Sequence, residues 1–407
     1  MGMNKDYSAG QNLDIIDAKI LTGHESFERG VLQIRGGLVE EILSLEQWER
    51  SSRDSLIPVN DASGRTLIPG LVDVHVHGGG GFDVMSRRKS DLEGMSLFHA
   101  SRGTTSFLAT TLTAGHNELI EAVRVVGECM QEGTSGAQIA GIHLEGPYLN
   151  KIRCGAQNPE HIRNVNLEEI RQYWDASQGQ IKLITLAPEH EQAEVSTRWL
   201  TERGVTVSVG HSDADFETVR KIVSAGASHA THLFNGMRPL HHREPGVAGA
   251  SLMLNEITVE LIADGIHVHP EWIKYVWSTK GSEKVVMVTD CIGQAGMMDG
   301  TFDFGGLPAM MVDGIAYLRL EDGSAGSLAG STLSLEKSLR NFLEWTGLPL
   351  KDLLPAYTSN PARQAGCLSH KGTLSPGKDA DFLLLGHEGK LEETWVRGRK
   401  VYSRHSE

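Results

Sequence analysis

The sequence predicts an α/β protein: a (β/α)8, TIM-like barrel with a small β-sandwich domain formed from both termini. Strand-like and amphipathic helical runs alternate through residues 69–365, which is typical of parallel strands joined by right-handed crossovers. Eight such units over roughly 290 residues suit a closed barrel. Short β-like runs separated by turn residues fill the two ends, residues 1–68 and 366–407, and predict the sandwich.

Eight apolar or β-branched runs are the predicted barrel strands, at 71–77, 105–111, 138–145, 181–188, 205–211, 229–235, 258–265 and 284–290. The clearest amphipathic segments between them are 117–130, 191–202, 213–224 and 270–279. Residues 331–346 read as the last barrel helix, with Ser331 as its N-cap. Residues 291–330 are rich in glycine and predict a loop region with a hairpin over or beside the site.

The composition is globular and acidic, which restricts the possible partners. The 407 residues are 40% hydrophobic and carry a formal net charge of −14 without a basic run, so we expect no nucleic-acid partner. No run of about 18 apolar residues is present, and the polar N-terminus MGMNKDYSAG predicts no signal peptide. Four cysteines without C-x-x-C spacing indicate free thiols. We therefore predict a cytoplasmic protein that does not enter membranes.

His75 and His77 end the first predicted strand, just before four consecutive glycines. Residues two apart on a strand point to the same face, so both imidazoles can reach one metal ion. The alternative is a pair of ordinary histidines in a polar turn. The apolar strand that precedes them favours the metal site.

Further candidate ligands stand at the ends of other predicted strands: Glu145, His211, His232 and Asp290. A carboxylate after an apolar run is costly to bury alone, although an arginine could also pair with Glu145. Each histidine taken singly fits a hydrogen-bonded core position. Together they lie at the carboxyl ends of strands, where barrel active sites are built. An open doubly wound sheet would instead gather its site at one switch point.

Several motifs resemble the amidohydrolase superfamily: PGLVDVHVHG, TSNPARQAG and GTLSPGKDADFLLL. More narrowly, others resemble the N-acetylglucosamine-6-phosphate deacetylases: HLEGPYL, GAQNP, VGHSDA, THLFNGM, HHREPGVAG, ADGIHV, VTDCIG and LAGSTLSL. That family bridges its metals with the glutamate of HLEGP, where many superfamily members use a carboxylated lysine. The resemblance implies a metal-dependent hydrolase that removes the N-acetyl group of N-acetyl-D-glucosamine 6-phosphate.

The resemblance also assigns roles to individual residues. It makes Glu145, His211 and His232 ligands of a central metal, and His75 and His77 ligands of a second metal that Glu145 bridges. Asp290 matches the general base and acid. Substrate contacts fall on Ala156, Gln157, Asn235, Gly236, Arg243, Asp264, Gly265, Ile266, His267, Leu328, Ala329 and Gly330. Arg243 and His267 match groups that hold the sugar phosphate, and a homodimer is implied in which Arg243 reaches the neighbouring site.

The expected cofactor is one or two divalent metal ions per subunit. Nitrogen and oxygen donors with an open position suit catalytic Zn2+, and the same donors suit Fe2+, Mn2+ or Co2+. Gln157 stands where some family members have a histidine that polarises the acetyl carbonyl; an amide can donate a hydrogen bond but carries no charge. Two alternatives stay open: another C–N hydrolase of the superfamily, acting on a cyclic amide or as a deaminase, and a metal-free scaffold.

Overall fold

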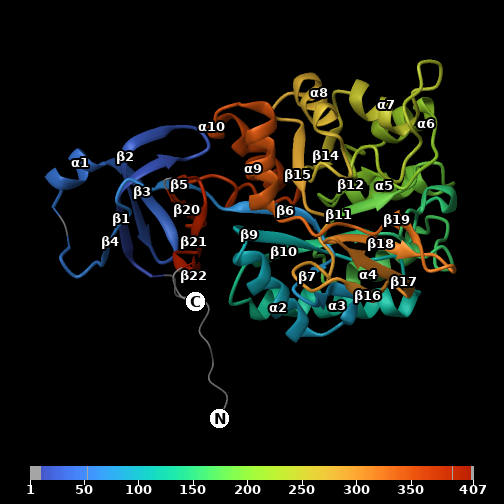
Figure 1. Ribbon diagram of the computed structural model, residues 1–407, viewed down its shortest axis with the longest axis horizontal. Helices are drawn as coiled ribbons and strands as arrows, with labels where there is room; N and C mark the ends of the chain where they lie inside the picture. The colour runs from blue at the N-terminus through green and yellow to red at the C-terminus, as the bar shows by residue number, and fades with distance from the viewer. Residues whose placement is uncertain (1–10, 53, 387, 405–407) are drawn as a thin grey trace, which may run out of the picture.

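A computed structural model of the chain describes residues 11–52, 54–386 and 388–404. The N-terminal segment for which no signal peptide is expected lies outside the described residues. Two units lie side by side, a barrel and a smaller sheet (Figure 1). No helix in the described ranges is long and apolar enough to cross a membrane.

Eight parallel strands form the barrel in chain order: β6 (Leu71–Val76), β9 (Thr104–Thr110), β10 (Gln138–Glu145), β11 (Ile181–Leu186), β12 (Thr206–Val209), β13 (His229–Ala230), β14 (Thr258–Ile262) and β15 (Val285–Val288). The first and last strands meet through a parallel bridge between Val76 and Cys291. There the Asp290 N–H donates to the His75 carbonyl at 3.0 Å. The predicted barrel is confirmed, and its closing seam lies beside two of the candidate site residues.

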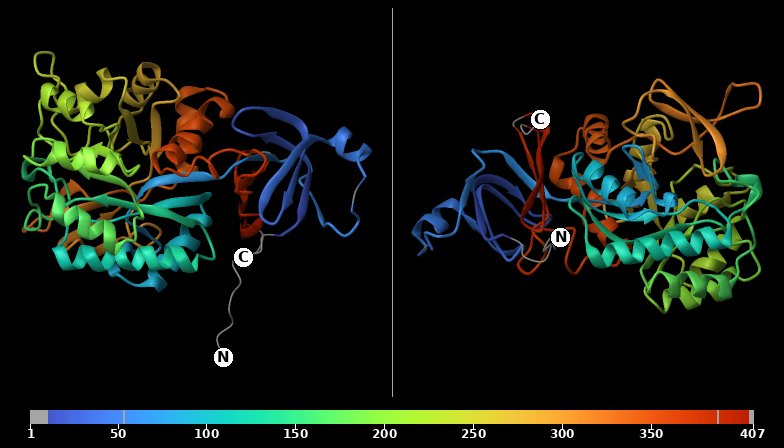
Figure 2. Two further views of the ribbon diagram at one scale, coloured as in Figure 1. Left: turned by 180° about the vertical axis from the view of Figure 1, so that it is seen from behind. Right: turned by 90° about the horizontal axis from the view of Figure 1, so that it is seen from below.

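Helices surround the barrel (Figure 2): α2 (Lys89–Ala100), α3 (His116–Glu132), α4 (Leu167–Ala176), α5 (Ala193–Thr201), α6 (Phe216–Ser224), α7 (Gly246–Met253), α8 (Pro270–Lys280), α9 (Leu335–Thr346), α10 (Leu350–Leu353) and α11 (Ser359–Gln364). Helix α6 illustrates why these segments are helical. Asp215 caps it by accepting the Thr218 N–H at 2.8 Å, and Val219 and Ile222 face the core.

Two expectations about these elements are wrong. The sixth strand ends at Ala230, not at 235, because His232 and Phe234 have φ of 26° and 81° and leave the extended conformation. Helix α9 begins after Ser334, which caps it by accepting the Lys337 N–H at 3.2 Å. Ser331 is not the cap; its hydroxyl donates to the Thr289 carbonyl.

Both ends of the chain build the smaller sheet from β1 (Leu13–Leu21), β2 (Ser26–Arg35), β3 (Leu38–Ser44), β4 (Val59–Asp61), β5 (Thr66–Pro69), β20 (Phe382–Leu385), β21 (Leu391–Val396) and β22 (Arg399–Ser403). Helix α1 (Leu45–Arg50) follows β3. Antiparallel pairing of β20 with β5 joins the two ends. The rings of Phe382 and Trp395 stack 5.2 Å apart in its core. The domain limits 1–68, 69–365 and 366–407 stay predictions.

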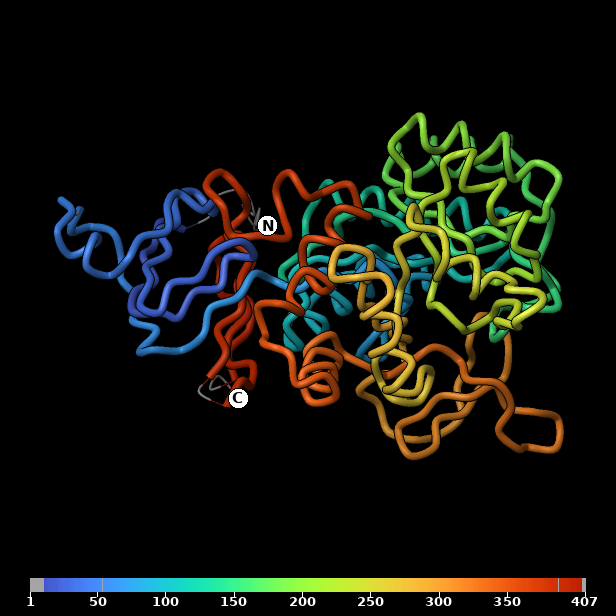
Figure 3. Tube along the Cα trace, turned by 90° about the horizontal axis from the view of Figure 1, so that it is seen from above, coloured from blue at the N-terminus to red at the C-terminus, as the bar shows by residue number. Residues whose placement is uncertain are grey.

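The glycine-rich segment after β15 is more ordered than expected. It forms a four-stranded antiparallel meander of β16 (Gly300–Phe304), β17 (Leu307–Val312), β18 (Ile315–Arg319) and β19 (Ala325–Leu328). Figure 3 shows the meander in orange beside the barrel. A short ribbon of β7 (Gly78–Gly79) and β8 (Phe82–Asp83) follows the first barrel strand. Short 3-10 turns occur at Val84–Ser86, Lys151–Arg153 and Leu354–Tyr357.

Candidate metal centre and active site

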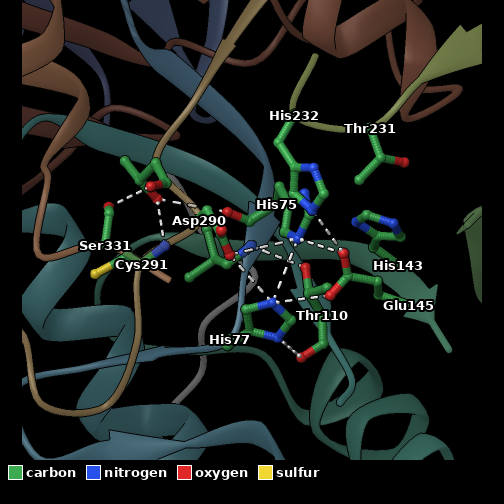
Figure 4. Close-up of polar contacts among 12 residues, drawn as sticks. His75, His77, Thr110, His143, Glu145, Thr231, His232, Asp290, Cys291 and Ser331 are labelled. Carbon is green, nitrogen blue, oxygen red and sulfur yellow. Dashed lines mark hydrogen bonds and ion pairs between the residues drawn. The ribbon is translucent and has the colours of Figure 1, made fainter. Parts of the chain in front are cut away.

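Six side chains predicted for the metal centre and its acid–base group meet at the carboxyl ends of five barrel strands. They are His75 in β6, His77 directly after β6, Glu145 at the end of β10, His211 after β12, His232 after β13 and Asp290 after β15. All six residues are buried. Figure 4 shows five of them, all but His211, converging on one point.

Glu145 lies between two groups of imidazoles. Its Oε1 is 3.2 Å from the Nε2 atoms of both His211 and His232. Its Oε2 is 3.2 Å from His77 Nε2. On the side of Glu145 where His75 and His77 lie, Asp290 Oδ1 is 3.2 Å from His77 Nε2 and 3.6 Å from His75 Nε2. One carboxylate therefore offers an oxygen to each of two neighbouring donor sets.

The spacing of these atoms fits a metal ion better than hydrogen bonding. Donors about 2.0–2.1 Å from a tetrahedral ion are roughly 3.3 Å from one another. The His75 and His77 Nε2 atoms are 3.3 Å apart, and those of His211 and His232 are 3.1 Å apart. Glu145 Oε1 is buried without a hydrogen-bond partner among the described residues. The cluster can hold a divalent metal.

Hydrogen bonds on the far side of three rings fix which nitrogen faces the centre. The Nδ1–H of His77 donates to the Thr110 carbonyl at 3.2 Å, and that of His211 donates to the Arg153 carbonyl at 2.9 Å. His75 Nδ1 lies 3.0 Å from the Glu260 carboxylate. Because Nδ1 carries the proton in each case, Nε2 keeps its lone pair for a ligand.

Strained backbone accompanies three of the six residues. His211, His232 and Asp290 have φ of 46°, 26° and 52°, in the region that residues with a Cβ rarely adopt. Such conformations cost about 1–3 kcal/mol each and cluster at functional sites. Gly236 lies against the same centre: its φ is +58°, and a Cβ there would stand 2.7 Å from His211 Nδ1.

Charges in the cluster keep its carboxylates ionised. Burial raises the pKa of Glu145, but the imidazoles around it, His75 first, lower that pKa to well below the usual range. Burial also opposes ionisation of Asp290, whose pKa is nevertheless lowered by His75 and His77. The same carboxylates raise the pKa of His77 to about 9 against the effect of its own burial. Protons therefore compete with a metal for this ring.

A cavity of about 280 Å³ opens above the six side chains. Seven residues predicted to contact the substrate line it: Ala156, Gln157, Asn235, Gly236, His267, Leu328 and Gly330. Five others do not: Arg243, Asp264, Gly265, Ile266 and Ala329. Gly155, Phe304 and Ser327 also line the cavity and were missed. Gly155 is the first residue of the GAQNP motif, whereas the other two come from the meander, within the 291–330 segment that was expected over or beside the site.

Three predicted substrate residues have informative surroundings. The Thr113 N–H donates to Gln157 Oε1 at 2.7 Å, and Gln157 Nε2 donates to Glu145 Oε2 at 2.5 Å. The amide nitrogen of Gln157 therefore faces the metal centre. His267 Nδ1 lies 2.6 Å from Asp264 Oδ2, and Asp264 raises the pKa of this ring although burial opposes the shift.

Arg243 differs from these residues because its side chain is exposed. Its Nη1 lies 2.9 Å from His242 Nε2. The lining of the cavity contains no lysine or arginine from the described part of this chain.

A barrel with histidine and carboxylate donors at its strand ends defines a metal-dependent hydrolase class. The amidohydrolase family model matches residues 66–401, and the chain belongs to that family. It is 37% identical over 96% of its length to the N-acetylglucosamine-6-phosphate deacetylase of Bacillus subtilis, covering 98% of that protein. It is 36% identical over 84% of its length to the N-acetylgalactosamine-6-phosphate deacetylase of Escherichia coli O157:H7, covering 89% of it.

A similar solved structure is that of a Mycobacterium smegmatis N-acetyl-D-glucosamine-6-phosphate deacetylase variant in complex with N-acetyl-D-glucosamine-6-phosphate. It is 32% identical, with a TM-score of 0.88, and the match covers 97% of this chain and 100% of that one. These relatives place the chain among the N-acetylglucosamine-6-phosphate deacetylases of the family.

Proposed function

We propose that the protein hydrolyses the acetamido group of N-acetyl-D-glucosamine 6-phosphate to give D-glucosamine 6-phosphate and acetate. The observation that carries this proposal is the Glu145 carboxylate, which lies between two imidazole pairs and beside Asp290 at the floor of the cavity. The relatives that share the fold are named for this reaction.

In this proposal Glu145, His211 and His232 hold one metal ion, and His75 and His77 hold a second that shares Glu145. Zn2+, Fe2+, Mn2+ and Co2+ all suit this donor set. A bound divalent cation would supply a water of lowered pKa and a Lewis acid for the acetyl oxygen. The remaining chemistry belongs to the chain's own side chains.

Asp290 moves the proton. Its ionised carboxylate accepts a proton from the attacking water as the water oxygen bonds to the acetyl carbon. Asp290 then returns that proton to the amide nitrogen as the C–N bond breaks, so that acetate and the free amine leave. Gln157 Nε2 faces the same region, and the Thr113 N–H fixes the amide by donating to its Oε1. Nε2 can therefore donate a hydrogen bond to the acetyl oxygen without carrying charge.

His267 and Arg243 are the proposed phosphate contacts. Asp264 orients the His267 ring and favours its charged form. The cavity of one subunit has no lysine or arginine in its described lining, which is a poor match for a phosphosugar. The exposed position of Arg243 supports a homodimer in which it reaches the partner's site.

A mixed-dimer experiment tests that arrangement. Asp290→Asn subunits combined with Arg243→Ala subunits would regain activity, because one of the two sites in each mixed dimer would then be intact. Absence of recovery in a verified mixed dimer would place Arg243 in its own subunit's site. We also propose that the enzyme works in the cytoplasm, where the phosphosugar would be available.

Acetate release from N-acetyl-D-glucosamine 6-phosphate by the metal-loaded protein tests the function. One specific observation favours a second candidate substrate, because the Escherichia coli relative is named for the galactosamine epimer at nearly the same identity. Parallel assays on both sugar phosphates decide between them. A kcat/KM at least tenfold higher for the glucosamine compound supports the proposal, and a higher value for its epimer replaces the substrate.

A further inference from the structure

Glu260 on β14 lies inside the barrel, next to the metal centre, and its side chain is fully buried. Its Oε2 lies 3.0 Å from His75 Nδ1 and accepts the His232 backbone N–H, also at 3.0 Å. Its Oε1 lies 3.0 Å from His229 Nε2. The Glu260 carboxylate thus contacts one residue of each donor set, His75 and His232. Only the contact with His75 is made through a ring that can bind a metal ion.

The group that accepts a hydrogen bond from Nδ1 of His75 is charged, whereas the groups that accept from Nδ1 of the neighbouring rings are neutral. Backbone carbonyls accept the Nδ1–H of His77 and His211. Among the described groups that bind Nδ1 of these three rings, Glu260 is the only carboxylate. A carboxylate on the far side of an imidazole fixes the tautomer and makes the ligating nitrogen more basic than a neutral carbonyl does. His75 should therefore be the strongest nitrogen donor of its pair.

The charge of Glu260 also suits a centre with two ions rather than one. Two divalent cations bring four positive charges into a buried site, and Glu145 and Asp290 offset only two of them. Uncompensated charge is costly in such surroundings. Glu260 adds a further negative charge one imidazole away, directly behind the His75 ring.

We propose that Glu260 is a positioning residue that sets the affinity of the metal position formed by His75 and His77, and so decides whether the enzyme holds two ions or one. This inference rests on the proposed function only in taking the donor cluster as a metal centre. It makes no use of the substrate, and it can be tested without one.

The test compares metal binding in wild type and Glu260→Gln. The amide keeps the size of the side chain and an oxygen that can accept from His75 and His232, while its charge is lost. Purified proteins are loaded with Zn2+, equilibrated with chelators of graded strength, and their bound metal per chain is measured. Wild type should release two ions in two steps. In the variant, the affinity of the His75–His77 position should fall about tenfold to a hundredfold, and the other should change less than threefold.

Two further variants separate positioning from general damage. Asp381→Asn removes another buried carboxylate, one that contacts Lys371 and Arg397 rather than the metal centre; it should lower thermal stability and leave both affinities unchanged. In a His75→Asn/His77→Asn background, Glu260→Gln should leave the affinity of the remaining ion within threefold. If Glu260→Gln does not fold, Glu260→Asp is used, because it retains the charge but withdraws the carboxylate from His75.

The outcomes are distinct. Equal weakening of both positions by Glu260→Gln, or no weakening of either, overturns the role of Glu260. A wild-type protein that never binds a second ion overturns the two-metal part of the proposed function as well. If wild type releases acetate and Glu260→Gln binds two ions with wild-type affinity, the proposed function stands and only this inference is rejected.

Discussion

Replacing Asp290 by asparagine tests the proposed proton transfer most selectively. The substitution keeps the shape of the side chain and an oxygen where Oδ1 now lies, 3.2 Å from His77 Nε2. It removes the ability to accept a proton from water and to return it to the leaving nitrogen. General acid–base catalysis is worth about a hundredfold to ten-thousandfold, which corresponds to roughly 3–5 kcal/mol of barrier. We expect kcat to fall by that factor, with KM changing little.

The assay is initial-rate acetate release from N-acetyl-D-glucosamine 6-phosphate, accompanied by metal analysis of the same preparations. The preparations are kept in excess metal, because the loss of the Asp290 charge beside His75 and His77 lowers the affinity for a cation. Under those conditions metal content should stay near the wild-type value, because the four imidazoles and Glu145 are untouched. Asp303→Asn is the matched control: it removes one exposed carboxylate from the meander, outside the cavity lining, and should leave kcat within about twofold. Near-normal turnover by Asp290→Asn at full metal content would refute the proton-transfer role.

Three further predictions concern the metals, the phosphate and acid stability. The double variant His75→Gln/His77→Asn should bind one ion instead of two, measured as metal per chain; loss of both ions would contradict the assignment. Arg243→Ala should raise KM for the 6-phosphate about tenfold to a hundredfold and hardly change KM for N-acetylglucosamine, whereas equal losses would indicate a structural role. Burial lowers the pKa of His99 to about 4, so the unfolded chain binds one more proton as pH falls from about 6.5 to about 4, and stability is lost in that window. In this window, His99→Gln should reduce the slope of the unfolding free energy against pH, measured by urea denaturation, by about 1.4 kcal/mol per pH unit. An unchanged slope would refute the linkage.

The barrel could be predicted because buried parallel strands leave a local signal. Runs such as 138–145 are mostly apolar and end at a turn, and β10 has the predicted bounds. The sixth strand is predicted too long because THLFN has the composition of a strand, although His232 and Phe234 adopt positive φ and end it. Backbone conformations imposed by tertiary contacts are not encoded in local propensity.

The residues of the candidate site also fall into a group that could be predicted from local sequence and a group that could not. The imidazoles and Glu145 follow strands, so their positions could be inferred from where strands end. Phe304 and Ser327 reach the cavity only because the meander folds back beside the barrel, a long-range event without a local motif. Glu260 gave one faint signal, a single carboxylate in the apolar run TVELI, and its partners were not visible until the strands were assembled.

The central claim is that the histidine–carboxylate cluster is a metal centre for deacetylation. The most direct measurement is acetate release from N-acetyl-D-glucosamine 6-phosphate by one preparation in three states: metal-loaded, chelator-stripped and reloaded with Zn2+, Fe2+, Mn2+ or Co2+. We predict turnover in the loaded state, loss of activity in proportion to the metal removed, and recovery with at least one of these ions. Full activity after the removal of all metal, or no acetate from a fully loaded protein, would contradict it.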